Sequence, residues 1–160
     1  FQDPDDQLFM PTVGEDIAFG PYNMGLRGDA LNKVVADALT QVGMLEFRDR
    51  PPHHLSFGQR RRVAVATVLA MQPEILVLDE PANGLDPLGI VWLREFVQKL
   101  AAEGRTILVS SHQLAEMQNT VDDVMIINRG VLVAQGTIDE IRQGKSLEEA
   151  FLELTMRRSA

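Results

Sequence analysis

The sequence has 160 residues, of which 45% are hydrophobic and 24% are charged, with a formal net charge of -8. These proportions are ordinary for a globular protein and exclude collagen, a coiled coil or a disordered tail. No apolar run approaches the roughly 18 residues of a bilayer-spanning helix, and no secretion leader is visible. The absence of cysteine excludes disulfides and thiolate metal sites. An acidic balance also argues against nucleic acid as the main partner. We therefore expect one acidic, soluble, cytoplasmic domain.

The segment up to about Pro52 is predicted to begin with loops and to continue as helix. Asp29 is a candidate cap for a helix in which apolar residues recur at helical spacing and which Gly43 ends. Pro51 and Pro52 interrupt the chain before the next helix, over about residues 59–71. We expect these elements to form a helical subdomain over about residues 1–70.

The second half alternates between short apolar runs and helices. Residues 75–78 and 106–109 predict buried strands of a parallel sheet. Residues 124–127 and 131–134 predict a hairpin around a three-residue loop of Asn128, Arg129 and Gly130. Helices are expected over about residues 88–102, from near Gln113, over 138–143 and over 147–154. Strands that alternate with helices predict an α/β core over about residues 71–160.

Asp79 and Glu80 directly follow the first predicted strand. In open α/β sheets, ligands bind beyond the carboxyl ends of the strands. An Asp at that place can hold Mg²⁺, and an adjacent Glu can polarise an attacking water. The alternative is an acidic strand end that simply faces solvent.

Residues 55–59 (LSFGQ) precede a basic helix start. A Ser hydroxyl, a Gly backbone N–H and a helix N-terminus together make an anion site that suits a phosphate. The alternative is an ordinary Ser N-cap before a solvated basic helix, and the segment taken alone favours that alternative.

The remaining candidates rest on histidines and on one apparent phosphate loop. His112 follows the second predicted strand and could contact a phosphate, although a lone His is more often structural. His53 and His54 are adjacent on a loop and do not converge on a metal. Residues 144–146 (GKS) lack the Gly five residues earlier and the preceding strand, so they are not a phosphate loop.

The order and spacing of these segments resemble an ATP-binding cassette ATPase over the whole chain. Gln2 and residues 55–59, 75–81, 83–86 and 110–112 resemble that family's Q-loop, signature, Walker B, D-loop and switch-histidine motifs. The resemblance implies part of a P-loop NTPase-like α/β fold, with ATP and Mg²⁺ as cofactors. It also implies a dimer that pairs head to tail and holds ATP between one subunit's phosphate loop and the other's signature.

The resemblance further implies a role for each matching residue. Glu80 would act as general base, and His112 would steady the γ-phosphate. The other matching residues would bind nucleotide or metal: Gln2 and Asp79 at Mg²⁺, Ser56, Gly58 and Gln59 in the signature that faces the partner's ATP, and Asp86 between the two sites. Phe57 departs from the commoner Gly but leaves Ser56 and Gly58 in place.

The family's phosphate loop lies upstream of the Q-loop, and no segment of the 160 residues matches it. We therefore expect the isolated chain neither to bind ATP tightly nor to hydrolyse it. We also expect the sheet to have an open edge that promotes self-association.

Two branches of the family are represented. Residues 1–9, 15–21 and 51–57 resemble energy-coupling-factor ATPases of cobalt, nickel or vitamin importers, whereas residues 82–87, 114–117 and 146–155 resemble ATPases of exporters. A hybrid joined near residues 80–84 and a divergent single member both fit. The implied partners are a transmembrane transporter subunit and a second ATPase subunit, with membrane contact only through the partner, on the cytoplasmic face.

Other functions fit less well. DNA-repair relatives insert a long coiled coil between Q-loop and signature, and Gln2 to Leu55 leaves no room for one. Translation-associated relatives carry two cassettes and usually a basic surface, and neither feature is visible in this sequence. A non-catalytic fragment that only binds a partner stays open.

Overall fold

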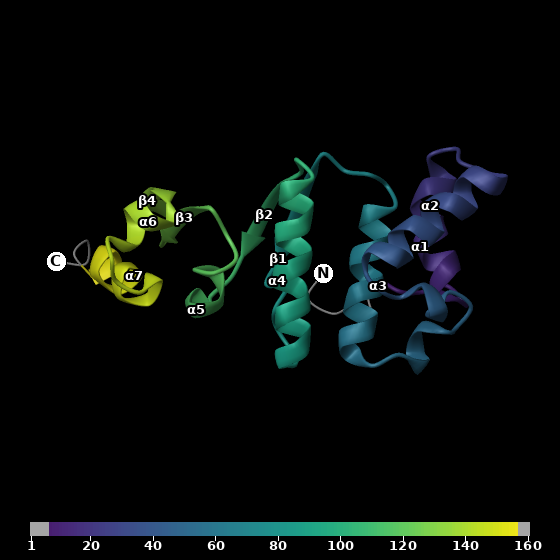
Figure 1. Cartoon of the computed structure of the whole chain (residues 1–160), viewed down its shortest axis with the longest axis horizontal. Coiled ribbons are helices and arrows are strands. Elements are labelled where there is room, and N and C mark those ends of the chain that lie inside the picture. Colours follow the sequence, from purple (N-terminus) through teal and green to yellow (C-terminus); the bar gives the residue numbers. More distant parts are fainter. Residues whose placement is uncertain (1–6, 157–160) are drawn as a thin grey trace.

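The computed structural model describes residues 7–156. Its helices are α1 (Val13–Asn23), α2 (Gly28–Gln41), α3 (Phe57–Leu69), α4 (Pro87–Ala102), α5 (Leu114–Met117), α6 (Ile138–Arg142) and α7 (Leu147–Met156), with the short 3-10 helices η2 (Leu45–Phe47) and η3 (Pro52–His54). Its strands are β1 (Ile75–Asp79), β2 (Thr106–Ser110), β3 (Asp123–Asn128) and β4 (Val131–Thr137). Figure 1 shows these elements in a row, with α1 to α3 at one end, β1, β2 and α4 in the middle, and β3, β4 and α5 to α7 at the other end.

The helical part includes a helix that the sequence analysis did not predict. Helix α1 begins after Thr12, whose hydroxyl accepts a hydrogen bond from the backbone N–H of Glu15, while the Glu15 carboxylate accepts one from the Thr12 N–H. This reciprocal cap satisfies two backbone donors that a helix start leaves unpaired. Asp29 is not the cap of α2, because the N-cap is Arg27 and Asp29 lies in the first turn.

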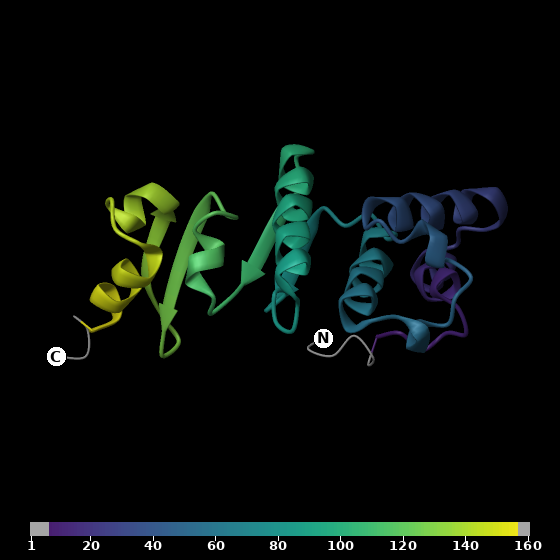
Figure 2. The same cartoon turned by 60° about the horizontal axis from the view of Figure 1, so that its bottom comes forward.

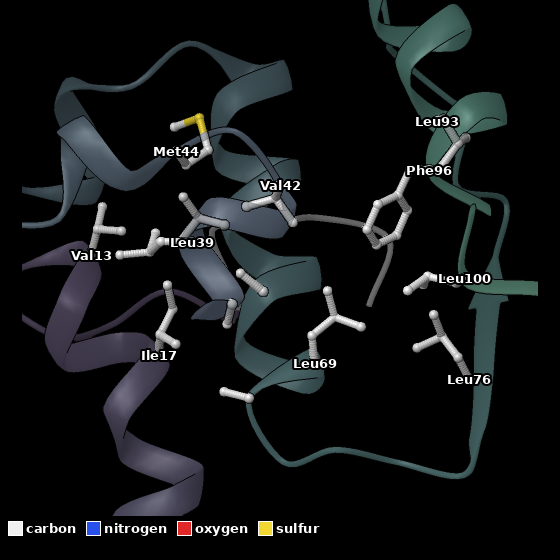
Figure 3. Close-up of a cluster of buried hydrophobic side chains, with 14 of the residues drawn as sticks. Val13, Ile17, Leu39, Val42, Met44, Leu69, Leu76, Leu93, Phe96 and Leu100 are labelled. Atoms are coloured by element: carbon white, nitrogen blue, oxygen red, sulfur yellow. The ribbon is translucent and has the colours of Figure 1, made fainter. Parts of the chain in front are cut away.

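A hydrophobic core joins the helical part to the first strand. Ile17 of α1 and Leu39 of α2 are fully buried and pack in the same cluster as Leu69 of α3. The cluster continues to Leu76 of β1 and Leu100 of α4 (Figure 3). The predicted division near residue 70 falls between α3 and β1, and it stays a prediction.

Strands β1 and β2 are parallel, with Ile75 opposite Thr106 and Asp79 opposite Ser110. The strands were expected to be buried on both faces, but only one face is covered. Leu76 is 3% exposed, whereas Ile75 and Val77 are 62% and 63% exposed. Helix α4 lies against the pair (Figure 1) and returns the chain to the start of β2. As a result, the carboxyl ends of both strands lie side by side.

Strands β3 and β4 form the predicted antiparallel hairpin, but its turn differs from the prediction. Asn128 pairs with Val131, so only Arg129 and Gly130 form the loop. Both have positive φ, at 50° and 77°, as a tight two-residue hairpin turn requires. Figure 2 shows the hairpin with α6 and α7 at the C-terminal end of the chain. Among residues 7–156, no helix is long and apolar enough to cross a bilayer.

Candidate functional site

The ends of β1 and β2 bring together two pairs of side chains, Asp79 with Glu80 and Ser110 with His112, that lie far apart in the sequence. Because Asp79 is opposite Ser110 in the parallel register, the Ser110 hydroxyl donates a hydrogen bond to Asp79 Oδ1. The same hydroxyl oxygen accepts a hydrogen bond from the Glu80 backbone N–H at 3.0 Å. Just beyond β2, His112 Nδ1 lies 2.9 Å from Glu80 Oε2. The structure therefore brings the candidate site residues Asp79, Glu80 and His112 together.

Glu80 has a strained backbone. Its φ is 46°, in the left-handed region that non-glycine residues rarely adopt. Such a conformation costs on the order of 1–3 kcal/mol and persists only where the surroundings hold it. The residue begins a turn over residues 80–86, in which the N–H of Asn83 bonds to the carbonyl of Glu80 at 3.2 Å. Residues with a strained backbone are often found at functional sites.

The signature segment, residues 55–59, forms the start of α3. Ser56 is the N-cap, its hydroxyl accepts from the Gln59 N–H at 3.3 Å, and Gln59 Oε1 accepts from the Ser56 N–H at 2.9 Å. The helix therefore begins at Phe57 rather than near residue 59. The N-cap interpretation is confirmed, and it is compatible with the anion site because a hydroxyl that accepts one bond still has a proton to donate.

Gly58 leaves the space beside the helix start open. A side-chain Cβ built at this glycine would meet only Leu85 Cδ2, at an ordinary contact distance of 3.9 Å. The backbone at the first turn of α3 is therefore accessible on that side, and N–H groups there point outward from the helix end. Gln59 contributes its amide oxygen to the cap, so its role as a nucleotide ligand stays a prediction.

The 80–86 turn leads directly into α4. Asp86 is the N-cap of α4 and accepts a hydrogen bond from the Gly89 N–H at 2.7 Å. Burial lowers the pKa of the Arg62 guanidinium. The negative charge of Asp86 opposes this shift but is the smaller influence. Arg62 lies over the Trp92 ring, 4.4 Å from its centroid. Asp86 thus has a structural role in this chain, and its predicted role between two sites is untested.

Residues 1–83 match the protein family described as ABC transporter. The chain belongs to this family. An energy-coupling factor transporter ATP-binding protein EcfA from Methanothermobacter thermautotrophicus is 47% identical over 155 residues, covering 96% of this chain and 50% of the relative. A Streptomyces coelicolor protein, provisionally named as an ABC transporter ATP-binding protein, is 57% identical over 157 residues, covering 94% of this chain and 59% of the relative.

The fold of the chain is the mixed α/β fold of ABC ATPases. The solved structure of cbiO1 from Clostridium perfringens, described as part of the ABC transporter complex cbiONQ, matches with a TM-score of 0.84 and 38% identity. The match covers 98% of this chain and 62% of cbiO1. The chain thus spans about half the length of the EcfA relative.

The residues at this ABC site fit Mg²⁺ and ATP only in part. Within residues 7–156, no group of three or more His, Cys, Asp or Glu could hold a metal ion. Asp79 can still supply one carboxylate. This suits Mg²⁺, because that ion takes one or two carboxylates from a protein and completes its shell with phosphates and water. Ser56 and the start of α3 offer donors for a phosphate. Gln2, the other predicted metal ligand, lies outside the described residues.

Two further predictions concern residues away from this site. The His53 and His54 rings meet edge to face on η3, with centroids 4.3 Å apart, and they belong to no metal-binding group among the described residues. Residues 144–146 follow α6, where Lys145 Nζ lies 2.5 Å from the Glu153 carboxylate and the Ser146 hydroxyl accepts a bond from the Glu149 N–H. Helix α6 precedes this segment, in place of the strand that a phosphate loop follows.

A cavity of about 190 Å³ lies between α3, β1 and α4 of the ABC fold. Its lining is mostly apolar, and its charged members among the described residues are Arg61 and Asp79. From the sequence, Arg61 was predicted only as part of a basic helix start, and no task was predicted for Ser110. Their contacts depend on which segments the fold brings together, and no local sequence pattern contains that information.

Proposed function

We propose that the chain is about half of an ATP-hydrolysing subunit that powers an energy-coupling-factor type ABC transporter. The observation that carries the proposal is the Glu80 carboxylate, held 2.9 Å from the His112 imidazole at the ends of two parallel strands. A carboxylate fixed beside an imidazole is suited to accept a proton from a water molecule. The likeness to EcfA supports transport as the process that is driven.

Each residue has a distinct task under this proposal. Glu80 orients the attacking water and accepts its proton, and His112 donates a hydrogen bond toward the terminal phosphate. Ser56 and the Gly58 N–H bind the phosphate of the nucleotide held by a second subunit. Asp79 binds Mg²⁺, directly or through water, and bound Mg²⁺ neutralises charge on the phosphates.

The proposed partners follow from the relatives. The solved relative cbiO1 is described as part of the ABC transporter complex cbiONQ. We therefore propose a transmembrane subunit and a second ATPase subunit as partners, on the cytoplasmic face of the membrane. The 155-residue match to EcfA covers 96% of the chain and so extends on both sides of residues 80–84. A single divergent member of the energy-coupling-factor branch explains that match more simply than a hybrid.

A test of ATP hydrolysis requires a protein that includes the family's phosphate loop, because this loop holds the nucleotide. We would join this sequence to the N-terminal region that precedes the matching segment of the Streptomyces coelicolor relative, and we call the product the phosphate-loop fusion. Phosphate release by this fusion is expected to fall at least about 10²-fold in Glu80→Gln. Glu103→Gln, at an exposed carboxylate after α4, is the matched control and is expected to retain activity. A fusion that binds ATP without hydrolysing it would support the non-catalytic alternative.

A further inference from the structure

Arg61 connects α3 to the turn that contains Glu80. Its Nη1 donates a hydrogen bond to the Asn83 carbonyl at 2.6 Å, and its Nη2 donates one to the Glu80 carbonyl at 2.9 Å. A guanidinium has its donors in a rigid planar fork, so one side chain can fix two acceptors at a defined separation. The two acceptors are the first and fourth residues of one turn, and the Asn83 N–H also bonds to the Glu80 carbonyl.

A second contact runs alongside this one. Gly84 has a φ of 73°, and a Cβ built on it would approach Phe57 Cε1 to 2.8 Å. The Phe57 ring therefore packs directly on the backbone of the turn, at the one signature residue that departs from the commoner Gly. The Arg61 guanidinium lies 5.8 Å from the centroid of the same ring. Phe57 and Arg61 thus attach the start of α3 to the 80–86 turn through side chains one helical turn apart.

The backbone of Glu80 is consequently held on both sides. From β2, Ser110 Oγ accepts the Glu80 N–H at 3.0 Å, and from α3, Arg61 donates to the Glu80 carbonyl. Because the φ of 46° is unfavourable for a glutamate, these two bonds supply the restraint that such a conformation needs. The direction of the Glu80 side chain depends on that backbone conformation.

We propose that Arg61 is a positioning residue that transmits the state of the signature segment to Glu80. When a phosphate binds at Ser56 and Gly58, the start of α3 is fixed, and Arg61 carries that constraint to the Glu80 carbonyl. The catalytic part of this inference rests on the proposed function above. The contact itself does not, so the two can be tested separately.

The contact is tested in the 160-residue chain by amide hydrogen exchange. Arg61→Met keeps most of the aliphatic stem and removes both donors, whereas Arg61→Lys keeps the charge but loses the fork. We expect the N–H groups of Asn83 and Leu85 to exchange at least about tenfold faster in Arg61→Met, with a smaller increase in Arg61→Lys. Arg94→Met, on α4, is the control for loss of a positive charge. Unchanged exchange at both amides in a folded Arg61→Met protein would overturn the proposal.

The catalytic part is tested in the phosphate-loop fusion. We expect Arg61→Met to lower kcat at least about tenfold, because a misplaced general base is less effective, while the Kd for ATP changes less than about twofold. Arg61→Lys should recover part of kcat. Faster exchange with unchanged kcat would show a structural contact only and would overturn the positioning role. A fusion that never hydrolyses ATP, even with Arg61 intact, would instead overturn the proposed function.

Discussion

Glu80 and His112 face each other across the ends of β1 and β2, with 2.9 Å between the carboxylate Oε2 and the imidazole Nδ1. The side chain of Glu80 is 26% exposed and that of His112 is 69% exposed. Solvent screens pairs of this kind, and they contribute little to folding. The pair therefore lies where stability does not require it, at the edge where α/β sheets bind ligands.

Removal of the imidazole should leave stability nearly unchanged. We expect His112→Ala to alter the free energy of unfolding of the 160-residue chain by less than about 1 kcal/mol. The measurement is urea denaturation followed by the fluorescence of Trp92, the one tryptophan in the chain. A loss of several kcal/mol would show that His112 is a structural residue.

The packing of Phe57 on Gly84 predicts a non-additive pair of substitutions. Gly84→Ala should destabilise the chain by about 1–3 kcal/mol, because it adds a Cβ at positive φ and brings it against the Phe57 ring. In a Phe57→Gly background the steric part should disappear and about 1 kcal/mol of backbone strain should remain. Equal effects of Gly84→Ala in both backgrounds, in thermal or urea unfolding, would contradict the packing.

Local signals in the sequence account for much of the fold. The apolar runs at residues 75–78 and 106–109 correspond to β1 and β2, and the Ser56 cap determines where α3 begins. Helix α1 was not predicted because it contains Gly14, Gly20 and Pro21, which are residue types typical of loops. The signal that could have found it is the Thr12 to Glu15 spacing of a capping box.

Three candidate site residues could be placed at strand ends from the sequence, whereas the contacts between them could not. Asp79, Glu80 and His112 were each predicted at the carboxyl end of a strand. The parallel register brings these strand ends together, while the roles of the three residues stay predictions. Nothing local indicated that Arg61 would contact the carbonyl of Glu80, because that bond joins residues 19 positions apart through tertiary packing. Likewise, the positive φ of Glu80 is a consequence of its surroundings rather than of its own preference.

The buried Asp16 predicts a pH dependence of stability. Asp16 is 4% exposed, and its Oδ1 accepts the N–H groups of Phe9 and Met10, each at 3.0 Å, while its Oδ2 has no hydrogen-bond partner among the described residues. Burial raises the pKa of this carboxyl above its ordinary value, although the two backbone bonds oppose the shift. The folded chain therefore holds this proton more tightly than the unfolded chain does.

The sign follows from proton linkage. Asp16 favours folding most below its unfolded pKa of about 4, and that contribution is lost as the pH rises through the higher folded pKa. We expect the stability of the original chain relative to Asp16→Asn to fall with rising pH across this window, as measured by urea unfolding at several pH values. The comparison cancels Glu140 and Glu149, whose pKa values are lowered by hydrogen bonds from Thr137 and Ser146. A relative stability that rises with pH would contradict the assignment.

The open face of β1 and β2 predicts self-association of the 160-residue chain. Ile75, Val77 and Leu108 are 62%, 63% and 46% exposed. Contiguous apolar surface on a sheet promotes contact between copies. We expect Val77→Thr together with Leu108→Thr to lower the weight-average mass in sedimentation equilibrium. Leu45→Gln, at an exposed residue of η2, should leave it unchanged. A monomeric original chain at all concentrations would refute the prediction.

The central claim is that Glu80 performs the hydrolytic step while Ser56 binds the nucleotide of a second subunit. The substitutions Glu80→Gln and Ser56→Ala separate these two roles in the phosphate-loop fusion. Glu80→Gln removes basicity but keeps shape, so it should block turnover and leave ATP-bound dimers intact. Ser56→Ala removes a phosphate contact, so it should weaken dimer formation as well as turnover. The most direct measurement is ATP-dependent dimer formation of both variants by size-exclusion chromatography. The account predicts dimers for Glu80→Gln and fewer for Ser56→Ala. Loss of the dimer in Glu80→Gln with full retention in Ser56→Ala would contradict it.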